Sequence, residues 1–182
     1  MRIAILGFSG SGKSTLAGFL SRRYGIPVLY LDSVHFEANW VPRPRAQALD
    51  MVSAFMAQPD WVIDGNYTDL LQAQRLELAD QIIYMPFPRL SCLIRVIRRY
   101  LRFRNTVRGS AAPGCTEKID AEFIWWVLYQ GRTRAVRRHF AEIVEKYREK
   151  TVILRSQRQL RRFMDCPVMP DCRRHASDEA AL

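Results

Sequence analysis

Residues 7 to 14 read Gly7-Phe8-Ser9-Gly10-Ser11-Gly12-Lys13-Ser14, and they follow the apolar run Ile3-Ala4-Ile5-Leu6. This stretch matches the pattern G-x-x-x-x-G-K-[ST], which is typical of a loop that binds the phosphates of a nucleotide. The glycines let successive backbone N–H groups point into one concavity, and a helix that begins near residue 13 adds the positive end of its dipole. The sequence therefore predicts a strand, a phosphate-binding P-loop and a helix, in that order.

The loop also indicates the cofactors. The ammonium of Lys13 is expected to reach the β- and γ-phosphates of ATP, and the hydroxyl of Ser14 is expected to hold Mg²⁺. We therefore predict ATP and Mg²⁺ as cofactors. The residues expected to bind ATP are Gly7, Ser9, Gly10, Ser11, Gly12, Lys13, Ser14 and Thr15.

Five apolar runs of strand length alternate with segments of helical length. This alternation predicts an α/β fold of the P-loop NTPase class, with one parallel sheet and helices on both of its faces. Gly131 separates the last two helical segments, which we expect to form an αα-hairpin. The predicted strands are 2–6, 27–31, 61–64, 81–85 and 151–155, and the predicted helices are 14–23, 45–57, 68–79, 88–103, 117–130 and 132–148.

Length and composition suit one folded domain. The chain has 182 residues, of which 48% are hydrophobic, and we expect the domain to span residues 1–164. Residues 165–182 combine prolines, paired arginines and small polar residues, so we expect a disordered tail there. The longest apolar run, 123–129, is far shorter than a membrane span, and the four cysteines lack C-x-x-C pairing. These features predict a cytoplasmic protein with reduced thiols and no membrane contact.

The net charge of +10 comes almost entirely from arginine, whose planar guanidinium binds two phosphate oxygens at once. Arg95 and Arg99 lie four residues apart, as do Arg98 and Arg102, so both pairs line faces of one helix. Since acids are nearly absent around them, we favour anion binding over a solvated helix face. A second arginine group that begins at Arg132 is expected to approach the same anion.

The segment 104–116 separates these two arginine groups. It contains Gly109, Pro113 and Gly114, has little periodicity, and falls between the fourth and fifth predicted strands. A lid over the phosphates is the favoured interpretation, and an inert surface loop is the alternative.

Polar residues just after the strands are candidates for the rest of the site, because ligands of parallel sheets bind at the carboxyl ends of strands. Asp64 ends the third apolar run and is expected to support Mg²⁺, with an Asx turn as the alternative. Asp32 follows the second run and is expected to position or deprotonate an acceptor, with a helix N-cap as the alternative. Within a substrate-binding segment of about 32–58 and after the third strand, the other candidate substrate contacts are His35, Trp40, Arg43, Gly65 and Asn66.

The chain resembles the FlaR-like group of P-loop proteins, which are often labelled DNA topology modulation proteins and are related to adenylate kinase. The resemblance covers about residues 1–164 and rests on 7–15, L-D-x-x-H at 31–35, W-V-I-D-G-N-Y at 61–67 and the segment 86–99. It implies a nucleoside-monophosphate-kinase fold with strand order 2-3-1-4-5, a substrate-binding segment after the second strand and a helical lid after the fourth.

The resemblance also implies residue roles. The D-G-N-Y run is similar to the D-G-F-P-R run of adenylate kinases, which places Asp64 at the Mg²⁺-associated acid, but this chain lacks the closing arginine. Arg95 and Arg99 resemble the two lid-proximal arginines of that family in spacing. The L-D-x-x-H element is also similar to gluconate-type kinases, which phosphorylate a hydroxyl.

Two functional hypotheses follow. The first is an ATP-dependent kinase for a nucleotide or a small hydroxyl-bearing metabolite, with an expected catalytic set of Lys13, Asp32, Asp64, Arg95, Arg99 and Arg132. The second is a nucleic-acid-associated regulator that binds ATP with little turnover, which the arginine-rich composition favours. The sequence identifies neither the acceptor nor the oligomeric state.

Overall fold

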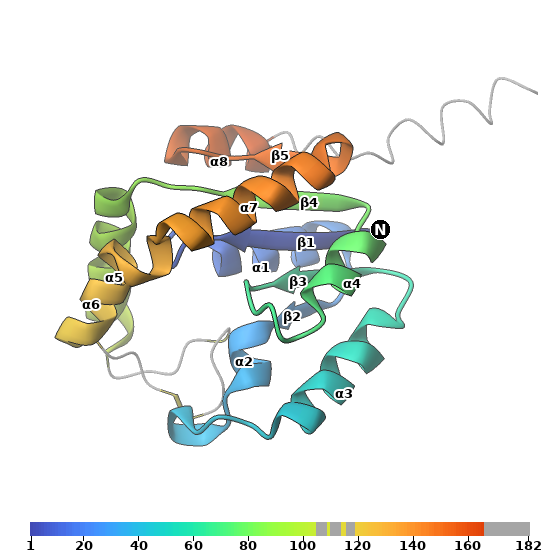
Figure 1. Cartoon of the computed structure of the whole chain (residues 1–182), viewed down its shortest axis with the longest axis horizontal. Coiled ribbons are helices and arrows are strands. Elements are labelled where there is room, and N and C mark those ends of the chain that lie inside the picture. The colour runs from blue at the N-terminus through green and yellow to red at the C-terminus, as the bar shows by residue number, and fades with distance from the viewer. Residues whose placement is uncertain (105–108, 110–113, 116–118, 166–182) are drawn as a thin grey trace, which may run out of the picture.

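A five-stranded parallel sheet forms the centre of the molecule. The computed structural model describes residues 1–104, 109, 114–115 and 119–165. In the described part, the strands lie in the order β2-β3-β1-β4-β5, and every neighbouring pair is parallel (Figure 1). This order, with the P-loop directly after the central strand, confirms the predicted nucleoside-monophosphate-kinase-like P-loop fold. The strands are β1 (Arg2–Gly7), β2 (Val28–Tyr30), β3 (Trp61–Asp64), β4 (Gln81–Met85) and β5 (Thr151–Ile153).

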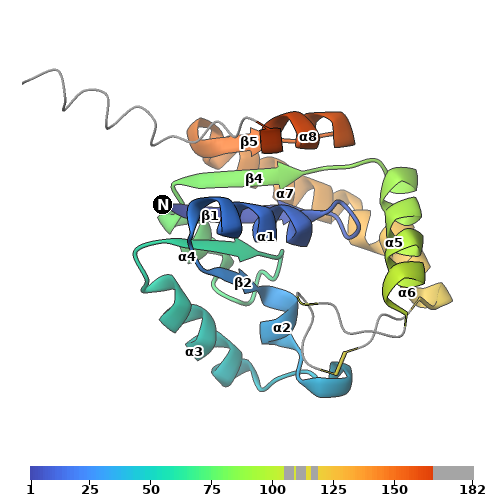
Figure 2. The ribbon, with the colours of Figure 1, turned by 180° about the vertical axis from the view of Figure 1, so that it is seen from behind.

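Helices cover both faces of the sheet, as predicted. Helix α7 (Arg134–Lys146) lies on the face toward the viewer in Figure 1, where Phe140 stacks on Tyr84 of β4 with ring centroids 4.9 Å apart. Helix α1 (Lys13–Tyr24) lies on the opposite face and buries Leu16 and Leu20 there (Figure 2). Because both faces are covered, the apolar residues of β1 run consecutively instead of alternating with polar ones.

The remaining helices connect the strands or follow the last one. Helix α4 begins four residues later than predicted, after Leu71 adopts a left-handed conformation at φ 56°. Two helices were not predicted at all, α2 and α8. The elements are α2 (Leu31–His35), α3 (Arg45–Met56), α4 (Gln72–Leu78), α5 (Arg89–Phe103), α6 (Ala121–Leu128), α8 (Gln157–Asp165) and the 3₁₀ turns η1 (Ala38–Trp40), η2 (Gln130–Arg132) and η3 (Arg148–Lys150).

The predicted αα-hairpin is wrong. Helix α6 packs against α5, and the η2 turn then directs α7 away from α6 and across the sheet (Figure 1). Gly131 does lie between the two helices, but within η2, where it is close to Trp126. A glycine between helices therefore marked the break correctly without giving the angle between them.

Parts of two predicted segments, the lid and the tail, lie outside the described residues. Most of the predicted lid falls in 105–108, 110–113 and 116–118, and the predicted tail falls almost wholly in 166–182.

Within the described ranges, no helix has the length and apolar composition that a bilayer crossing requires.

The P-loop packs directly against the backbone of α5. Gly10 has φ 77°, and a Cβ atom placed on it would lie 2.5 Å from the carbonyl oxygen of Cys92. A Cβ on Gly12 would lie 2.9 Å from the guanidinium of Arg95. The loop thus occupies a space that only glycine leaves free, and its position depends on that of α5.

This packing generates a test of stability. Replacing Gly10 by alanine should lower the free energy of unfolding by about 3 kcal/mol, because it adds a backbone clash to the strain of a left-handed residue. Gly25 is the matched control: it has φ 65°, but a Cβ atom placed on it would have no neighbour within 4 Å. Gly25→Ala should therefore cost only about 1 kcal/mol. Urea unfolding of both variants measures the difference, and equal costs would contradict the packing argument.

Candidate functional site

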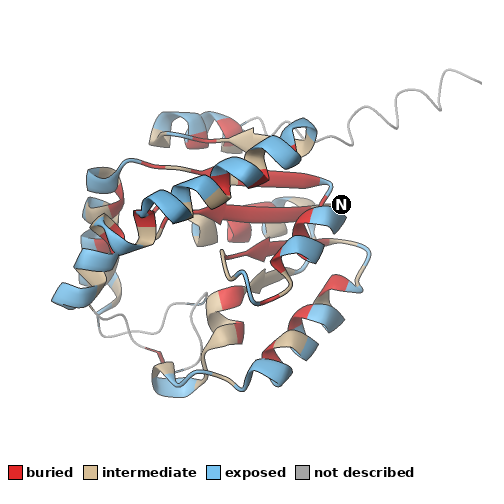
Figure 3. Cartoon of the chain, in the orientation of Figure 1, coloured by how far each residue is buried: buried red, intermediate tan, exposed pale blue. Residues whose placement is uncertain are grey.

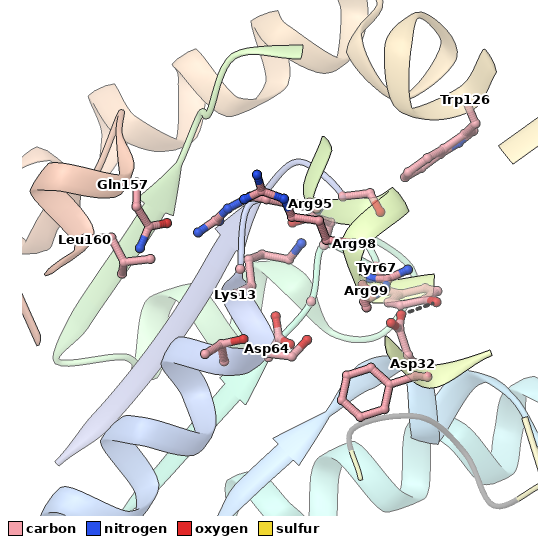
Figure 4. Close-up of a pocket in the computed structure, with 18 of the residues that line it drawn as sticks. Lys13, Asp32, Asp64, Tyr67, Arg95, Arg98, Arg99, Trp126, Gln157 and Leu160 are labelled. Atoms are coloured by element: carbon pink, nitrogen blue, oxygen red, sulfur yellow. Dashed lines mark hydrogen bonds between the residues drawn. The ribbon is translucent and has the colours of Figure 1, made fainter. Parts of the chain in front are cut away.

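A cavity of about 840 Å³ lies beside the P-loop, at the carboxyl ends of β1 and β3. Figure 4 shows that side chains from distant segments point into it, including Lys13, Asp32, Asp64 and Arg95. The P-loop and the start of α1 contribute Ser9, Gly10, Gly12, Lys13, Ser14 and Thr15 to its lining. The remaining lining residues are Asp32, Asp64, Gly65, Asn66, Tyr67, Thr68, Asp69, Arg95, Arg98, Arg99, Arg102, Phe103, Trp126, Gln157, Leu160, Arg161 and Met164.

The P-loop leaves the start of α1 open toward the cavity. Gly12 precedes the helix in a left-handed conformation, and no side chain of the described residues caps the first turn. The N–H groups there are suited to an anion. The ammonium of Lys13 reaches the carbonyl oxygen of Phe8 at 3.3 Å, on the rim of the same concavity. Gly7 and Ser11 were also predicted to bind ATP, but they lie behind the lining, and Ser11 is fully buried.

Among the described residues, five arginines converge on the cavity from two helices. Arg95, Arg98, Arg99 and Arg102 come from α5, as predicted, and Arg161 comes from α8. Arg95 donates a hydrogen bond to the carbonyl oxygen of Ser11, and its guanidinium lies 5.0 Å from the ring centroid of Phe87. Burial lowers the pKa of Arg95, and the charge of Arg161 also lowers it. A bound polyanion would relieve this repulsion between cations.

Oxygen ligands for Mg²⁺ are present at one edge of the cavity. Asp64 ends β3, pairs in register with Ile5 of β1, and is almost fully buried. Its carboxylate and the Ser14 hydroxyl line the same cavity. No cluster of three or more His, Cys, Asp or Glu able to hold a metal occurs among the described residues. The residues present therefore fit a Mg²⁺ ion that takes its other ligands from phosphates and water, as is usual for this ion.

Asp32 is held in place by Tyr67, which was not among the predicted site residues. The hydroxyl of Tyr67 donates a hydrogen bond to Oδ1 of Asp32 at 2.9 Å (Figure 4). Burial raises the pKa of Tyr67, and the negative charge of Asp32 raises it further, so the phenol stays protonated and remains a donor. His35 does not line the cavity; its ring packs on Tyr67 with centroids 4.7 Å apart.

Asn66 lines the cavity but uses its side chain to hold the P-loop. Its amide accepts from the N–H of Gly7 at 3.0 Å and donates to the carbonyl oxygen of Gly7 at 2.7 Å. The backbone oxygen of Asn66 in turn accepts from Gln72 at 2.8 Å, and Gln72 lies 2.7 Å from His139 of α7. Asn66 was predicted as a substrate contact, and this geometry indicates a structural role in addition.

Arg75 organises the loop that follows β3. Its side chain is completely buried and donates to three carbonyl oxygens: those of Gly65 at 3.3 Å, Tyr67 at 2.7 Å and Leu70 at 2.9 Å. Burial lowers the pKa of Arg75 to about 10, although the nearby carboxylate of Asp64 opposes this shift. Arg75 therefore fixes the backbone that carries Asp64, Gly65 and Tyr67 to the cavity.

The structure places Arg132 outside the cavity. It is buried, donates to the carbonyl oxygens of Val127 at 3.0 Å and Phe87 at 2.8 Å, and lies 3.9 Å from the ring centroid of Phe8. This arginine therefore supports the P-loop from behind, and its predicted contact with the anion stays a prediction. Arg132 was not expected to point into the protein, because the sequence alone gives no sign that η2 is partly buried.

Trp40 and Arg43 also lie outside the cavity lining. The ring of Trp40 packs against Phe36 with centroids 5.2 Å apart, and its backbone N–H donates to the sulfur of Cys115 at 3.2 Å. Arg43 donates to the carbonyl oxygen of Val34 at 2.8 Å and pairs with Glu37 at 3.3 Å. Both side chains thus stabilise the segment after α2, and their role in substrate binding stays a prediction.

The cavity has a wall that sequence reasoning missed. Helix α8 contributes Gln157, Leu160, Arg161 and Met164, and α6 contributes Trp126. Trp126 stacks on Phe123, but it is also 40% exposed and faces the cavity (Figure 4). A base or another flat group has apolar surface to contact on this side.

Solved structures of other proteins resemble this chain in fold. The chain is similar to a shikimate kinase from Bacteroides thetaiotaomicron, with 16% sequence identity and a TM-score of 0.47 over 91% of this chain and 94% of that chain. No protein-family model matches the sequence, and no curated protein matches it. A similarity at this level does not define a substrate, and the FlaR-like assignment stays a prediction.

The three carbonyl contacts of Arg75 predict a large loss of stability on its removal. Arg75→Met keeps much of the volume but leaves three buried acceptors without their donor, so the free energy of unfolding should fall by about 3 kcal/mol or more. Arg45 is an exposed control on α3, and Arg45→Met should change stability by less than about 0.5 kcal/mol. Chemical denaturation measures both; a cost below about 1 kcal/mol for Arg75→Met would exclude this role.

Proposed function

We propose that this protein is an ATP-dependent phosphotransferase that moves the γ-phosphoryl group of ATP to a hydroxyl group of a small metabolite. The observation that carries the proposal is the placement of the Asp32 carboxylate in the same cavity as Lys13 and the α5 arginines. A phosphate cradle alone is common to many nucleotide-binding proteins. A positioned carboxylate facing that cradle is what a kinase for a hydroxyl acceptor requires.

On the donor side, the chain supplies positive charge and orientation. The N–H groups at the start of α1 and the Lys13 ammonium bind the β- and γ-phosphates, and Arg95 and Arg99 neutralise charge as the phosphoryl group transfers. Ser14 and Asp64 would hold Mg²⁺, whose positive charge would offset the negative charge of the phosphates. Phosphoryl transfer needs no covalent enzyme intermediate, in keeping with a lining rich in cations.

On the acceptor side, Asp32 favours a hydroxyl over a phosphate. A carboxylate accepts a hydrogen bond from a hydroxyl and can take up its proton as the new P–O bond forms and ADP leaves. A phosphate acceptor would be repelled at this position. The D-G-N-Y run also lacks the arginine that closes the corresponding run of adenylate kinases, which supports the same choice. Tyr67 keeps the carboxylate oriented through its hydrogen bond.

We also propose that the chain belongs to the FlaR-like group and acts in the cytoplasm. The combination of the P-loop, L-D-x-x-H at 31–35 and W-V-I-D-G-N-Y at 61–67 supports the first proposal. Cysteines without C-x-x-C pairing support the second.

A nucleic-acid-associated regulator is the second candidate. The net charge of +10 favours it, together with exposed Arg134, Arg137 and Arg138 on α7. Titration of duplex DNA at several salt concentrations separates the two candidates. Binding through phosphates should weaken with salt at a log–log slope of about −0.9 per phosphate contacted. Tight DNA binding without kinase turnover would favour the regulator, and no affinity at low salt would exclude it.

The central test is a coupled ADP-release screen over nucleosides, nucleotides, sugars and sugar acids, followed by variants on the acceptor that it identifies. Asp32→Asn should lower kcat by about 10²–10⁴-fold, because the general base is lost. Its affinity for a fluorescent ATP analogue should stay within about 2-fold of wild type, because Asp32 does not belong to the P-loop. Lys13→Ala, the donor-side control, should lose both ATP affinity and turnover.

Tyr67→Phe removes the hydroxyl that holds Asp32 while leaving the ring against His35, so it should lower kcat less than Asp32→Asn does.

Wild-type turnover in Lys13→Ala would contradict the kinase assignment. Wild-type turnover in Asp32→Asn alone would instead reject Asp32 as the base.

A further inference from the structure

Helix α5 exposes an apolar stripe on the side away from the sheet. The stripe consists of Leu90, Ile94, Ile97 and Leu101, which are 70%, 49%, 41% and 62% exposed. The opposite side of the helix buries Cys92 and Val96 against the protein. Four large aliphatic side chains that share one face of a surface helix are uncommon without a partner.

The neighbouring helix extends this apolar surface. Helix α6 packs against α5 and exposes Trp125 and Tyr129, whose ring centroids lie 4.4 Å apart. Figure 3 shows the outward sides of α5 and α6 coloured as exposed. Since large side chains have surfaces of roughly 150–250 Å², the exposed fractions leave on the order of 600 Å² of apolar surface in each molecule.

The spacing within the stripe matches a helix–helix seam. Steps of four, three and four residues follow the a and d positions of a heptad, which is a narrower pattern than that of helices that lie in a membrane surface. An antiparallel pairing about a twofold axis would place Leu90 opposite Leu101 of a second copy and Ile94 opposite Ile97 of that copy. The stripe is therefore complementary to itself.

The flanking residues are compatible with this pairing. Helix α5 contains no acid, so like-charge contacts between arginines would be the main obstacle. In the antiparallel register, Arg98 lies beside Ser91 of the second copy. The two copies of Arg98 therefore do not face each other. The other pocket arginines of α5, such as Arg95, lie on the cavity side of the helix. Two copies that covered this whole surface, with Trp125 and Tyr129 beside the stripe, would together bury about 1,200 Å², which reaches the lower end of stable, specific interfaces.

We propose that the apolar stripe of α5 is the interface with a second copy of this chain. The inference is independent of the proposed kinase activity, since none of the four stripe residues lines the cavity. Because the interface is apolar and the two copies share a net charge of +10, association should strengthen as salt is raised.

The test is the mass of the protein in solution, measured by analytical ultracentrifugation or light scattering on the full chain. Wild type should show about twice the chain mass of 21.2 kDa. Ile94→Glu should shift the mass to that of one chain at the same concentration. Leu78→Glu is the matched control, because Leu78 on α4 is 41% exposed and lies outside the stripe, and this variant should keep the wild-type mass.

Circular dichroism establishes that each variant is folded. If Ile94→Glu fails to fold, Leu90→Gln combined with Leu101→Gln replaces it, since these are the two most exposed stripe residues. A monomeric wild-type protein at 0.15 and 0.5 M salt would overturn the proposal. So would a monomer that sediments with phosphatidylserine-containing vesicles and is released by salt, which would assign the stripe to a membrane surface.

Discussion

The close approach of the P-loop to α5 is the constraint on which the rest of the site depends. The backbone at Gly10 lies so near the Cys92 carbonyl that no side chain fits between them. Consequently the phosphate cradle and the helix that carries Arg95, Arg98, Arg99 and Arg102 form one rigid unit. The packing that shapes the loop also orients α5 toward the cavity. No further contact is therefore needed to position its arginines.

A second set of contacts fixes the loop after β3 to this unit. Asn66 pairs with both backbone groups of Gly7, and Arg75 binds three carbonyl oxygens of the segment that follows Asp64. Buried polar groups contribute stability only when their partners are in place, so such networks hold a unique arrangement more strictly than apolar packing does. These contacts therefore fix the position of the β3 loop relative to the P-loop, and they keep Asp64 and Ser14 at one edge of the cavity.

Sequence patterns predicted the sheet because consecutive apolar residues indicate burial on both faces. The P-loop motif predicted Lys13. Asp32 and Asp64 were predicted because strand ends in such sheets meet at one edge. Other features depend on burial that only the fold creates. Nothing in the sequence separates Arg75 or Arg132, which hold carbonyl groups inside the protein, from Arg98, which faces the cavity. Helix α8 was missed because its charged sequence offers few apolar positions, of which Leu160 and Phe163 are buried.

The strand order separates the parts of the site that follow different strands, so that one part can change without the others. The P-loop follows β1, Asp64 ends β3, and Asp32 follows β2, so three neighbouring strands each deliver one component. The spacing of the strands sets the distance between these components. Two intervals of about 4.8 Å separate β1, which precedes the P-loop, from β2, which precedes Asp32. Strand β2 lies at the sheet edge, and beyond the buried Leu31 and Val34 of α2 the residues 36–44 are exposed or half-buried, so changes there would leave the inner two strands undisturbed. Under the proposed function, selectivity for the acceptor can therefore diversify while the nucleotide end of the site remains unaltered.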